Sequence, residues 1–351
     1  MEQMTFAQVA KRFSDEASAW EYVEALRWNG HPVCPRCASP DVLYLRPIDG
    51  NLRKTRTGTA TYRRVWKCRS CKRQFSVLIG TIFEGSKIPL RKWVMAIYLM
   101  VAGKNGVAAL ELQRDLEITY KSAWHMVHRI RAAMSNINGG GKMRGIIVAD
   151  EAFIGGNPQK ANTKRRKTLE ANHSDKTPVL TIVDARTGEI RSQVVANVQS
   201  NTLGPIINAN VDRLGSILYT DSGTQYVAIG RRFVNHYTVN HTEGEYVNKT
   251  NGASTNIVES HFSQLKRSID GTHHGVSPEH LNRYVREFDF CYSTRKMVDG
   301  ERGMQLMRQT EGVRVTYRSL IAEGPFASGK RRIPPGRPGP RTTGASSPHP
   351  V

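Results

Sequence analysis

The chain has 351 residues, and its 51 lysines and arginines outnumber 30 acidic residues to give a net charge of +21. A surplus of this size attracts polyanions, so we favour a nucleic acid as partner over the alternative of an ordinary basic protein. The polar segment 1–16 and the lack of a long apolar run exclude a secretory signal and a membrane span, which predicts a cytoplasmic, nucleoid-associated bacterial protein. Five cysteines are too few and too unevenly placed for a disulfide scaffold.

Changes of composition divide the chain into six parts. Residues 1–30 are expected to be helical, because apolar residues such as Trp20 and Val23 recur at helical spacing. Residues 323–351 are mostly Gly, Pro, Ser, Thr and Arg and are expected to be disordered, since they lack apolar side chains. Between these ends the sequence predicts a zinc ribbon at 31–85, a helix-turn-helix region at 86–138, a mixed α/β domain at 142–300 and an extension at 301–322.

Four of the cysteines form two Cys-x-x-Cys pairs, with 30 residues between Cys37 and Cys68. A two-residue gap lets both sulfurs of one turn reach the same tetrahedral ion, so two pairs predict a structural Zn²⁺ site made by Cys34, Cys37, Cys68 and Cys71. Four reduced cysteines without a metal are the alternative. Basic residues near the second pair predict DNA contact by Arg63, Arg64 and Lys67, whereas a ribbon that only stabilises a small fold is the alternative.

The next segment predicts three helices, at about 93–101, 105–116 and 121–131. Thr119 is the expected N-cap of the third helix. An inward stripe of Trp124, Val127 and Ile130 leaves one polar face free for DNA, and a plain bundle with a solvated basic face is the alternative. The residues predicted to contact DNA are Lys121, Ser122, His125, His128 and Arg129.

Two acids follow apolar strands. Asp150 lies inside a strongly apolar run, where an unpaired carboxylate is costly to desolvate and should bind a metal or another partner. Alternation places Asp150 and Glu151 on opposite faces of the strand, so only one of them is expected to be a direct ligand. A second strand ends at Asp221, and Gly223 then allows a tight turn at a position where ligands commonly collect.

A third acid lies on a predicted helix that begins near Ser254 or Thr255. Helical spacing places Asn256, Glu259 and Lys266 on one face of this helix. Acids from a strand centre, a strand end and a helix are the oxygen ligands that a pair of Mg²⁺ or Mn²⁺ ions requires, and Lys266 would then face a DNA phosphate. The alternative is that each acid is an ordinary cap or salt-bridge partner.

Three blocks of sequence resemble one known family: Asp150-Glu-Ala-Phe-Ile-Gly-Gly, Tyr219-Thr-Asp221-Ser-Gly, and Asn256-Ile-Val-Glu259 with the residues that follow to Lys266. With the ribbon, they are similar to the zinc-ribbon insertion-sequence transposases of the insertion-sequence fifteen-ninety-five group, over about Trp20 to Arg295. The resemblance implies an RNase-H-like catalytic domain in which Asp150, Asp221 and Glu259 hold the metal ions. Asn256 is the competing third ligand, because some relatives have Asn in place of the last acid.

The resemblance further implies a DDE-type DNA transposase that binds terminal inverted repeats, cuts the element ends by hydrolysis and joins the freed 3′-hydroxyls to target DNA. Because two ends must be joined, we expect a homodimer or larger assembly on double-stranded DNA. The rival interpretations are a non-transposing nuclease or resolvase of the same fold and a domesticated DNA-binding regulator. The basic insert 160–176 resembles the variable loop of the family, which lies over DNA or is mobile, and a solvated run of charge is the alternative.

Overall fold

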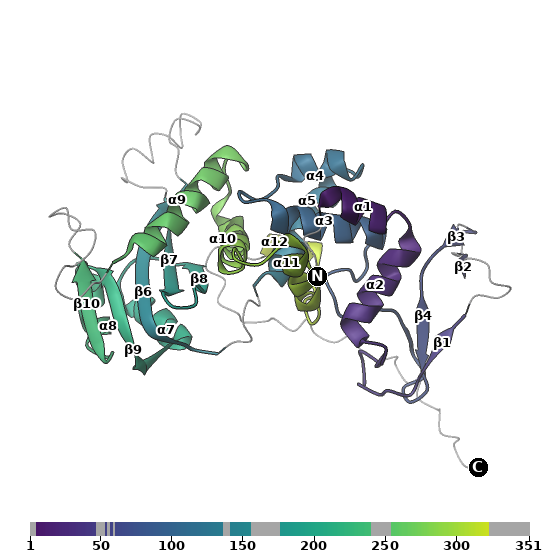
Figure 1. Ribbon diagram of the computed structural model, residues 1–351, viewed down its shortest axis with the longest axis horizontal. Coiled ribbons are helices and arrows are strands. Elements are labelled where there is room, and N and C mark those ends of the chain that lie inside the picture. The colour runs from purple at the N-terminus through teal and green to yellow at the C-terminus, as the bar shows by residue number, and fades with distance from the viewer. Residues whose placement is uncertain are drawn as a thin grey trace, which may run out of the picture.

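A computed structural model describes residues 5–46, 53–54, 57–58, 60–135, 141–155, 176–239 and 254–322. The predicted tail 323–351 and nearly all of the insert 160–176 lie outside these residues. The molecule is elongated, with a large sheet at one end, the cysteine-bearing strands at the other and helices between them (Figure 1). No described helix is both long and apolar enough to cross a membrane.

The cysteine pairs lie on a small antiparallel sheet in the order β1-β4-β5, beside a two-stranded ribbon of β2 and β3. Two helices precede these strands, and the second begins at Asp15, whose carboxylate accepts a hydrogen bond from the backbone N–H of Ser18. The elements of this part are α1 (Phe6–Arg12), α2 (Glu16–Trp28), β1 (Val42–Leu45), β2 (Arg53–Lys54), β3 (Ala60–Thr61), β4 (Val65–Cys68) and β5 (Gln74–Phe75).

The three helices predicted next are α3 (Leu90–Ala102), α4 (Ala109–Asp115) and α5 (Tyr120–Ala133). Thr119 is the N-cap of α5, as predicted, and its hydroxyl accepts a hydrogen bond from the backbone N–H of Ser122. The start of α3 is capped from outside, because the Glu16 carboxylate of α2 accepts hydrogen bonds from the backbone N–H groups of Leu90 and Arg91. These contacts join α2 and α3 into one apolar core with α5.

One face of α5 differs from the prediction. His128 and Arg129 were expected to be exposed to DNA, but both are buried. The Arg129 guanidinium donates to the backbone carbonyls of Glu84 and Val315, at 2.6 and 3.0 Å, and lies over the Trp93 ring. A segment near the C-terminus therefore covers this part of α5, which the local sequence could not indicate. Arg129 stabilises the fold here.

The large sheet contains five strands in the order β10-β9-β6-β7-β8. Strands β10, β9 and β6 are parallel to one another. Strand β7 pairs antiparallel with both β6 and β8, so the sheet is mixed. The predicted mixed α/β fold is confirmed. The strands are β6 (Met143–Ile154), β7 (Thr177–Asp184), β8 (Ile190–Val194), β9 (Val211–Asp221) and β10 (Asn235–Val239).

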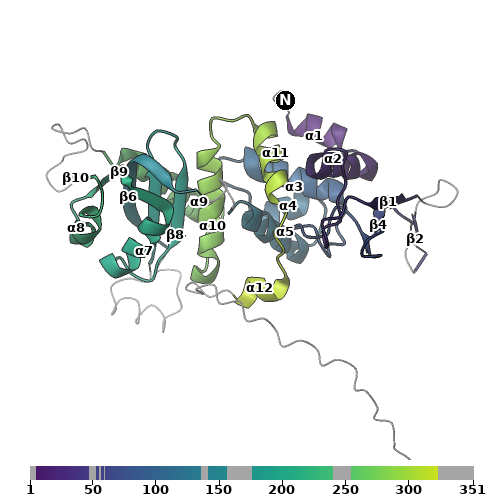
Figure 2. The ribbon, with the colours of Figure 1, turned by 90° about the horizontal axis from the view of Figure 1, so that it is seen from below.

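Each face of the sheet has its own core. Side chains of β6 alternate between the two: Val148 and Ala152 pack with α9 (Asn256–Gly271) and α10 (Pro278–Ser293), whereas Ile147 and Ala149 pack with α7 (Ser200–Asn210) and α8 (Thr224–Gly230). In Figure 2, α10 stands between the sheet and helices α3 to α5. Helix α10 therefore lies at the interface between the sheet domain and the helix bundle.

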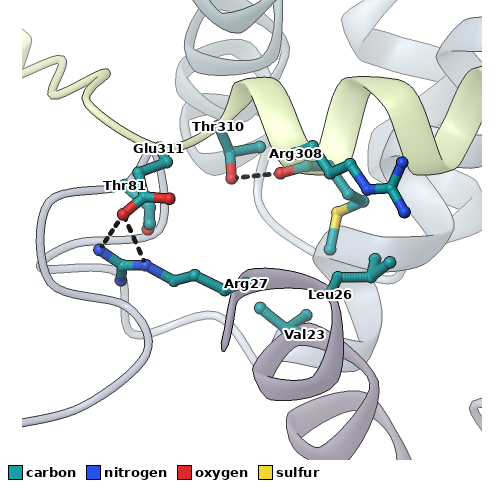
Figure 3. A pocket seen from close by; sticks show the side chains of 8 residues that line it. Val23, Leu26, Arg27, Thr81, Arg308, Thr310 and Glu311 are labelled. Carbon is teal, nitrogen blue, oxygen red and sulfur yellow. Dashed lines mark hydrogen bonds and ion pairs between the residues drawn. The ribbon is translucent and has the colours of Figure 1, made fainter. Parts of the chain in front are cut away.

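The C-terminal helices α11 (Asp299–Gln309) and α12 (Tyr317–Ala322) return to the N-terminal part. At the end of α11, the Glu311 carboxylate pairs with the Arg27 guanidinium of α2 at 3.0 Å, and its backbone pairs with Thr81 (Figure 3). Arg27 also donates to the carbonyl of Ile79, at 2.8 Å. The small cavity at this junction, about 70 Å³ in volume, is a packing gap.

A buried ion pair joins the helix bundle to the sheet domain. Arg131 of α5 donates to the Glu287 carboxylate of α10 at 2.7 Å, and the two side chains are 1 % and 0 % exposed. The same guanidinium stacks over the Tyr284 ring, 3.8 Å from its centroid. Next to this pair, Ser268 of α9 donates to the carbonyl of Asn105 at 2.5 Å. The junction is thus polar and buried.

We predict that Glu287→Gln lowers the free energy of unfolding by about 3 to 5 kcal/mol, because it leaves the buried Arg131 charge uncompensated. Asp212→Asn is the control: Asp212 pairs with Arg144 at 3.8 Å, with side chains 42 % and 75 % exposed, and its loss should cost no more than about 1 kcal/mol. Urea unfolding measures both. Equal effects of the two substitutions would contradict the structural role of the buried pair.

A second prediction concerns pH. Burial, and next the charges of Arg131 and Arg283, lower the pKa of His128 to about 2, and neither of its ring nitrogens has a hydrogen-bond partner among the described residues. Below the unfolded pKa of about 6.5, only the unfolded chain takes up this proton, so stability falls as pH falls. From pH 7.5 to 5.5, His128→Gln should lose about 1 kcal/mol less stability than the wild type. The exposed control His31→Gln should not differ from the wild type, and a matching effect there would refute this assignment.

Candidate functional site

The four paired cysteines converge at the turns of the small sheet. Sulfur atoms of different pairs lie 3.7 Å apart for Cys34 and Cys71 and 3.6 Å apart for Cys37 and Cys68, and all four lie within 4.8 Å of one another. The two turns have the same geometry: the first cysteine N–H donates to the carbonyl five residues later, at 3.0 Å in each turn. The residue after each pair, Ala38 or Lys72, has a positive φ of 55° or 59°.

This arrangement fits zinc. Four sulfurs at about 2.3 Å from one tetrahedral ion lie roughly 3.8 Å apart, close to the separations seen here. The backbone N–H of Cys71 donates to the Cys68 sulfur at 3.4 Å, and this hydrogen bond is the main cause that lowers the pKa of Cys68 to about 6. A thiolate at this position is what zinc binds. The predicted structural Zn²⁺ site is therefore supported by both the geometry and the chemistry of the ligands.

At the other end of the molecule, Asp150 and Asp221 lie on neighbouring parallel strands. The pairing of β6 with β9 brings Val148 opposite Tyr219, and each acid follows two residues later on its strand. Side chains two residues apart share a face, and both Val148 and Tyr219 pack in the core beneath α9. The two carboxylates thus lie on the α9 face of the sheet. Each is half-buried, and each also accepts a local hydrogen bond, from the backbone N–H of Glu151 or Gly223.

Glu259 reaches the same face from the first turn of α9. Its neighbours Val258 and Phe262 pack with Val148 of β6, and the helix lies across β6 and β7 (Figure 1). The N-cap Thr255 makes no side-chain cap, and its hydroxyl donates to the Glu259 carboxylate at 3.1 Å. Asn256 and Lys266 lie on the same helix and are both exposed.

The three acids share a face but are less tightly gathered than the cysteines. Among the described residues, only the four cysteines form a group of three or more His, Cys, Asp or Glu side chains close enough to hold one ion. Carboxylate oxygens are nevertheless the donors that Mg²⁺ and Mn²⁺ prefer, and a two-ion site does not require every ligand to reach both ions. The donor set therefore fits hard divalent cations.

Glu151 lies on the opposite face of β6 from Asp150, beside Tyr226 of α8. Burial, with a smaller contribution from the charges of Asp150 and Asp221, raises the pKa of Glu151 to about 7. Burial, and next the charges of Glu151, Asp150 and Asp221, raise the pKa of Tyr226 well above its usual value. Asp150 and Asp221 are thus near enough to act electrostatically on one group. The sequence placed Glu151 on the far face but gave no sign of Tyr226.

A network of polar side chains connects the sheet with α9 and α10. Asp289 of α10 accepts hydrogen bonds from the backbone N–H and the hydroxyl of Ser192, both at 2.6 Å, and lies 3.4 Å from the His261 ring. The Thr181 hydroxyl donates to Ser192 at 2.8 Å, and Thr181 is paired with Asp150 in the sheet. These side chains link β7, β8, α10 and α9, and sequence reasoning missed them because their partners lie far apart in the chain.

The residues predicted to bind DNA have different environments. Arg63, Lys67 and Lys121 are exposed, and Ser122 and His125 are half-buried at the start of α5. Arg64 is held instead by α2: its guanidinium lies 2.8 Å from the Glu24 carboxylate and stacks over the Tyr44 ring. Arg64 and Arg129 are thus committed to internal contacts and His128 is buried, whereas the other predicted residues remain accessible.

A mixed five-stranded sheet with helices on both faces, carrying acids on β6, β9 and α9, defines an RNase-H-like domain joined to a zinc ribbon. Residues 142–293 match the model of the ISXO2-like transposase domain, and residues 14–74 match that of the transposase zinc-ribbon domain. The chain belongs to the zinc-ribbon insertion-sequence transposases, the family that its sequence blocks resemble.

Two curated relatives agree with this family. A protein of the transposable element ISH50 from Halobacterium salinarum is 27 % identical over 293 residues, which cover 79 % of this chain and 91 % of the relative. A transposase-like protein from Haemophilus influenzae is 29 % identical over 111 residues, which cover 31 % of this chain and 85 % of the relative.

We predict one Zn²⁺ per chain in the purified wild type and a clear loss of bound zinc in Cys68→Ser, because three thiolates hold the ion less firmly than four. Elemental analysis by mass spectrometry measures the ratio. The control is Cys291→Ala, which removes a buried cysteine outside the cluster and should keep its zinc. Wild-type protein that is folded without zinc would contradict the assignment.

Proposed function

We propose that this protein is a DNA transposase that cuts the ends of its element by hydrolysis and joins them to target DNA. The observation that carries the proposal is the common position of Asp150, Asp221 and Glu259 on the α9 face of one sheet. The family of the chain supports the same conclusion. No other described set of acids combines two neighbouring strands with a covering helix in this way.

In the proposed reaction, Asp150, Asp221 and Glu259 would hold two Mg²⁺ ions. When bound, these ions would activate the attacking oxygen and stabilise the leaving oxygen of the scissile phosphodiester. Thr255 orients the Glu259 carboxylate through its hydroxyl, and the α9 core fixes the helix on the sheet. Lys266, two turns beyond Glu259 and exposed, would neutralise a phosphate of the bound strand.

The chemistry proceeds in two displacements. In the first, a water oxygen forms a bond to phosphorus at the element end, and the bond from phosphorus to the 3′-oxygen breaks, which leaves a 3′-hydroxyl. In the second, that hydroxyl attacks a target phosphodiester, and the target 3′-oxygen leaves and takes a proton from solvent. The number of phosphodiester bonds is unchanged in the second step, so joining needs no cofactor that supplies energy.

Recognition of the element ends is assigned to the helix-turn-helix and the ribbon. Lys121, Ser122 and His125 lie at the N-terminal end of α5, the part of a recognition helix that reaches base edges in the major groove. Arg63 and Lys67 would contact phosphates. Because two ends are joined in one event, the active form is proposed to contain at least two copies of the chain.

We predict that Asp221→Asn lowers end cleavage and strand transfer by on the order of 10³-fold or more, because an amide is a poor ligand for Mg²⁺. The control is Asp270→Asn, an exposed acid on α9 beyond the predicted site, which should retain wild-type rates. The assay uses a labelled duplex from the DNA that flanks the gene, with a supercoiled plasmid as target and Mg²⁺ or Mn²⁺ present.

Three results would count against the proposal. Cleavage without joining would favour a nuclease of the same fold. Tight binding with neither reaction, in the presence of both metals, would favour a domesticated regulator. Full activity of Asp221→Asn would show that the acids on this face do not carry the chemistry.

A further inference from the structure

A groove lies between the ribbon and the helix bundle. Its volume is about 1120 Å³, and its walls come from β2, the segment before β4, the turn 85–89 and the start of α3. A second hollow of about 480 Å³ adjoins it and ends at the start of α5 and at Tyr317 of α12. Gly85, Ser86, Lys87, Ile88 and Trp93 line both hollows. The two therefore form one continuous track from the ribbon to the helix proposed to read DNA.

The track is strongly basic. Lys54 and Arg63 line its ribbon end, Lys87 its middle and Lys121 its far end, and all four side chains are exposed. None of them forms an ion pair with a carboxylate in the part of the chain that the structure describes; Lys121 lies over the Tyr317 ring, 5.7 Å from its centroid. Four cations without an acidic partner among the described residues create a line of positive potential.

Glu16, the only acid among the described residues that line the track, is already engaged. Glu16 caps α3 through the backbone N–H groups of Leu90 and Arg91, and it also accepts from the Trp20 indole at 3.0 Å. The Glu16 carboxylate therefore interacts with the N-terminus of α3.

We propose that this track binds the sugar–phosphate backbone of duplex DNA and so connects contacts made by the ribbon with those made by α5. The inference deepens the proposed function, because it rests on the chain acting on DNA and names the surface that holds it. A row of spaced cations suits a repeating series of phosphates. An acidic peptide would present charges without this regular repeat. Lys54 and Lys87 are thereby assigned to binding, in addition to the residues predicted from sequence.

Salt dependence provides the test. Each phosphate contact that is lost lowers the slope of log Kd against log salt by about 0.9, so Lys54→Gln and Lys87→Gln should each flatten the slope by about 1 and weaken binding several-fold at 0.1 M salt. Lys11→Gln and Lys296→Gln are matched controls, since both lysines are exposed and outside the track. The probes are a labelled 40-base-pair duplex from the DNA that flanks the gene and a shuffled duplex of the same length.

The expected outcome is an equal loss of slope on both duplexes, because phosphate contacts carry no sequence information. Unchanged zinc content and circular dichroism in each variant will separate a lost contact from a misfolded ribbon. Slopes for Lys54→Gln and Lys87→Gln that equal those of the two controls would overturn the proposal. Tighter binding of a single-stranded RNA of the same length would also overturn it. Neither result would touch the chemistry, since that is tested separately by the effect of Asp221→Asn on joining.

Discussion

Parallel pairing of β6 with β9 is the constraint on which the proposed active site depends. It fixes the register between the strands, so Asp150 and Asp221 follow Val148 and Tyr219 onto the same face. Like charges on one face repel, and burial makes the repulsion stronger. Burial is the main cause that raises the pKa of Glu151 on the opposite face, and the charges of Asp150 and Asp221 add to it. Oxygen ligands that repel one another in this way are suited to a pair of divalent cations, which would cancel the charge.

The second requirement is that α9 stays in place on the sheet. Apolar packing of Val258, Phe262 and Leu265 supplies most of the contact, and the polar network through His261 and Asp289 sets the position behind it. The position of Glu259 therefore depends on residues on α10 and β8 that do not approach the substrate. Because α10 also carries Glu287, whose partner is on α5, one helix supports both the acids and the helix proposed to read DNA.

Local patterns in the sequence were enough for much of the architecture. The Cys-x-x-Cys spacing predicted a cluster that the structure forms, and alternation along β6 predicted opposite faces for Asp150 and Glu151, whose neighbours Val148 and Ile147 pack in different cores. Thr119 was recognised as an N-cap because capping depends only on neighbouring residues.

Features made by distant segments could not be predicted. Arg129 was assigned to DNA, but its partners are carbonyls at Glu84 and Val315, one of them 186 residues away. The partner of Arg64 on α2 and the neighbour of Glu151, Tyr226 of α8, are also distant in the sequence, so local patterns did not indicate them. A helical periodicity shows which side of a helix is apolar, but not whether a second element covers its polar side. The track beside the ribbon also has walls from four separate segments, so no single motif marks it.

The three carboxylates on the α9 face of the sheet are proposed to hold a pair of divalent cations, and anomalous diffraction from crystals soaked in Mn²⁺ can locate such ions. We expect two peaks about 4 Å apart between Asp150, Asp221 and Glu259, each within bonding distance of at least one of these carboxylates. Strong Mn²⁺ peaks elsewhere, with these three side chains bonded only to protein groups, would contradict it.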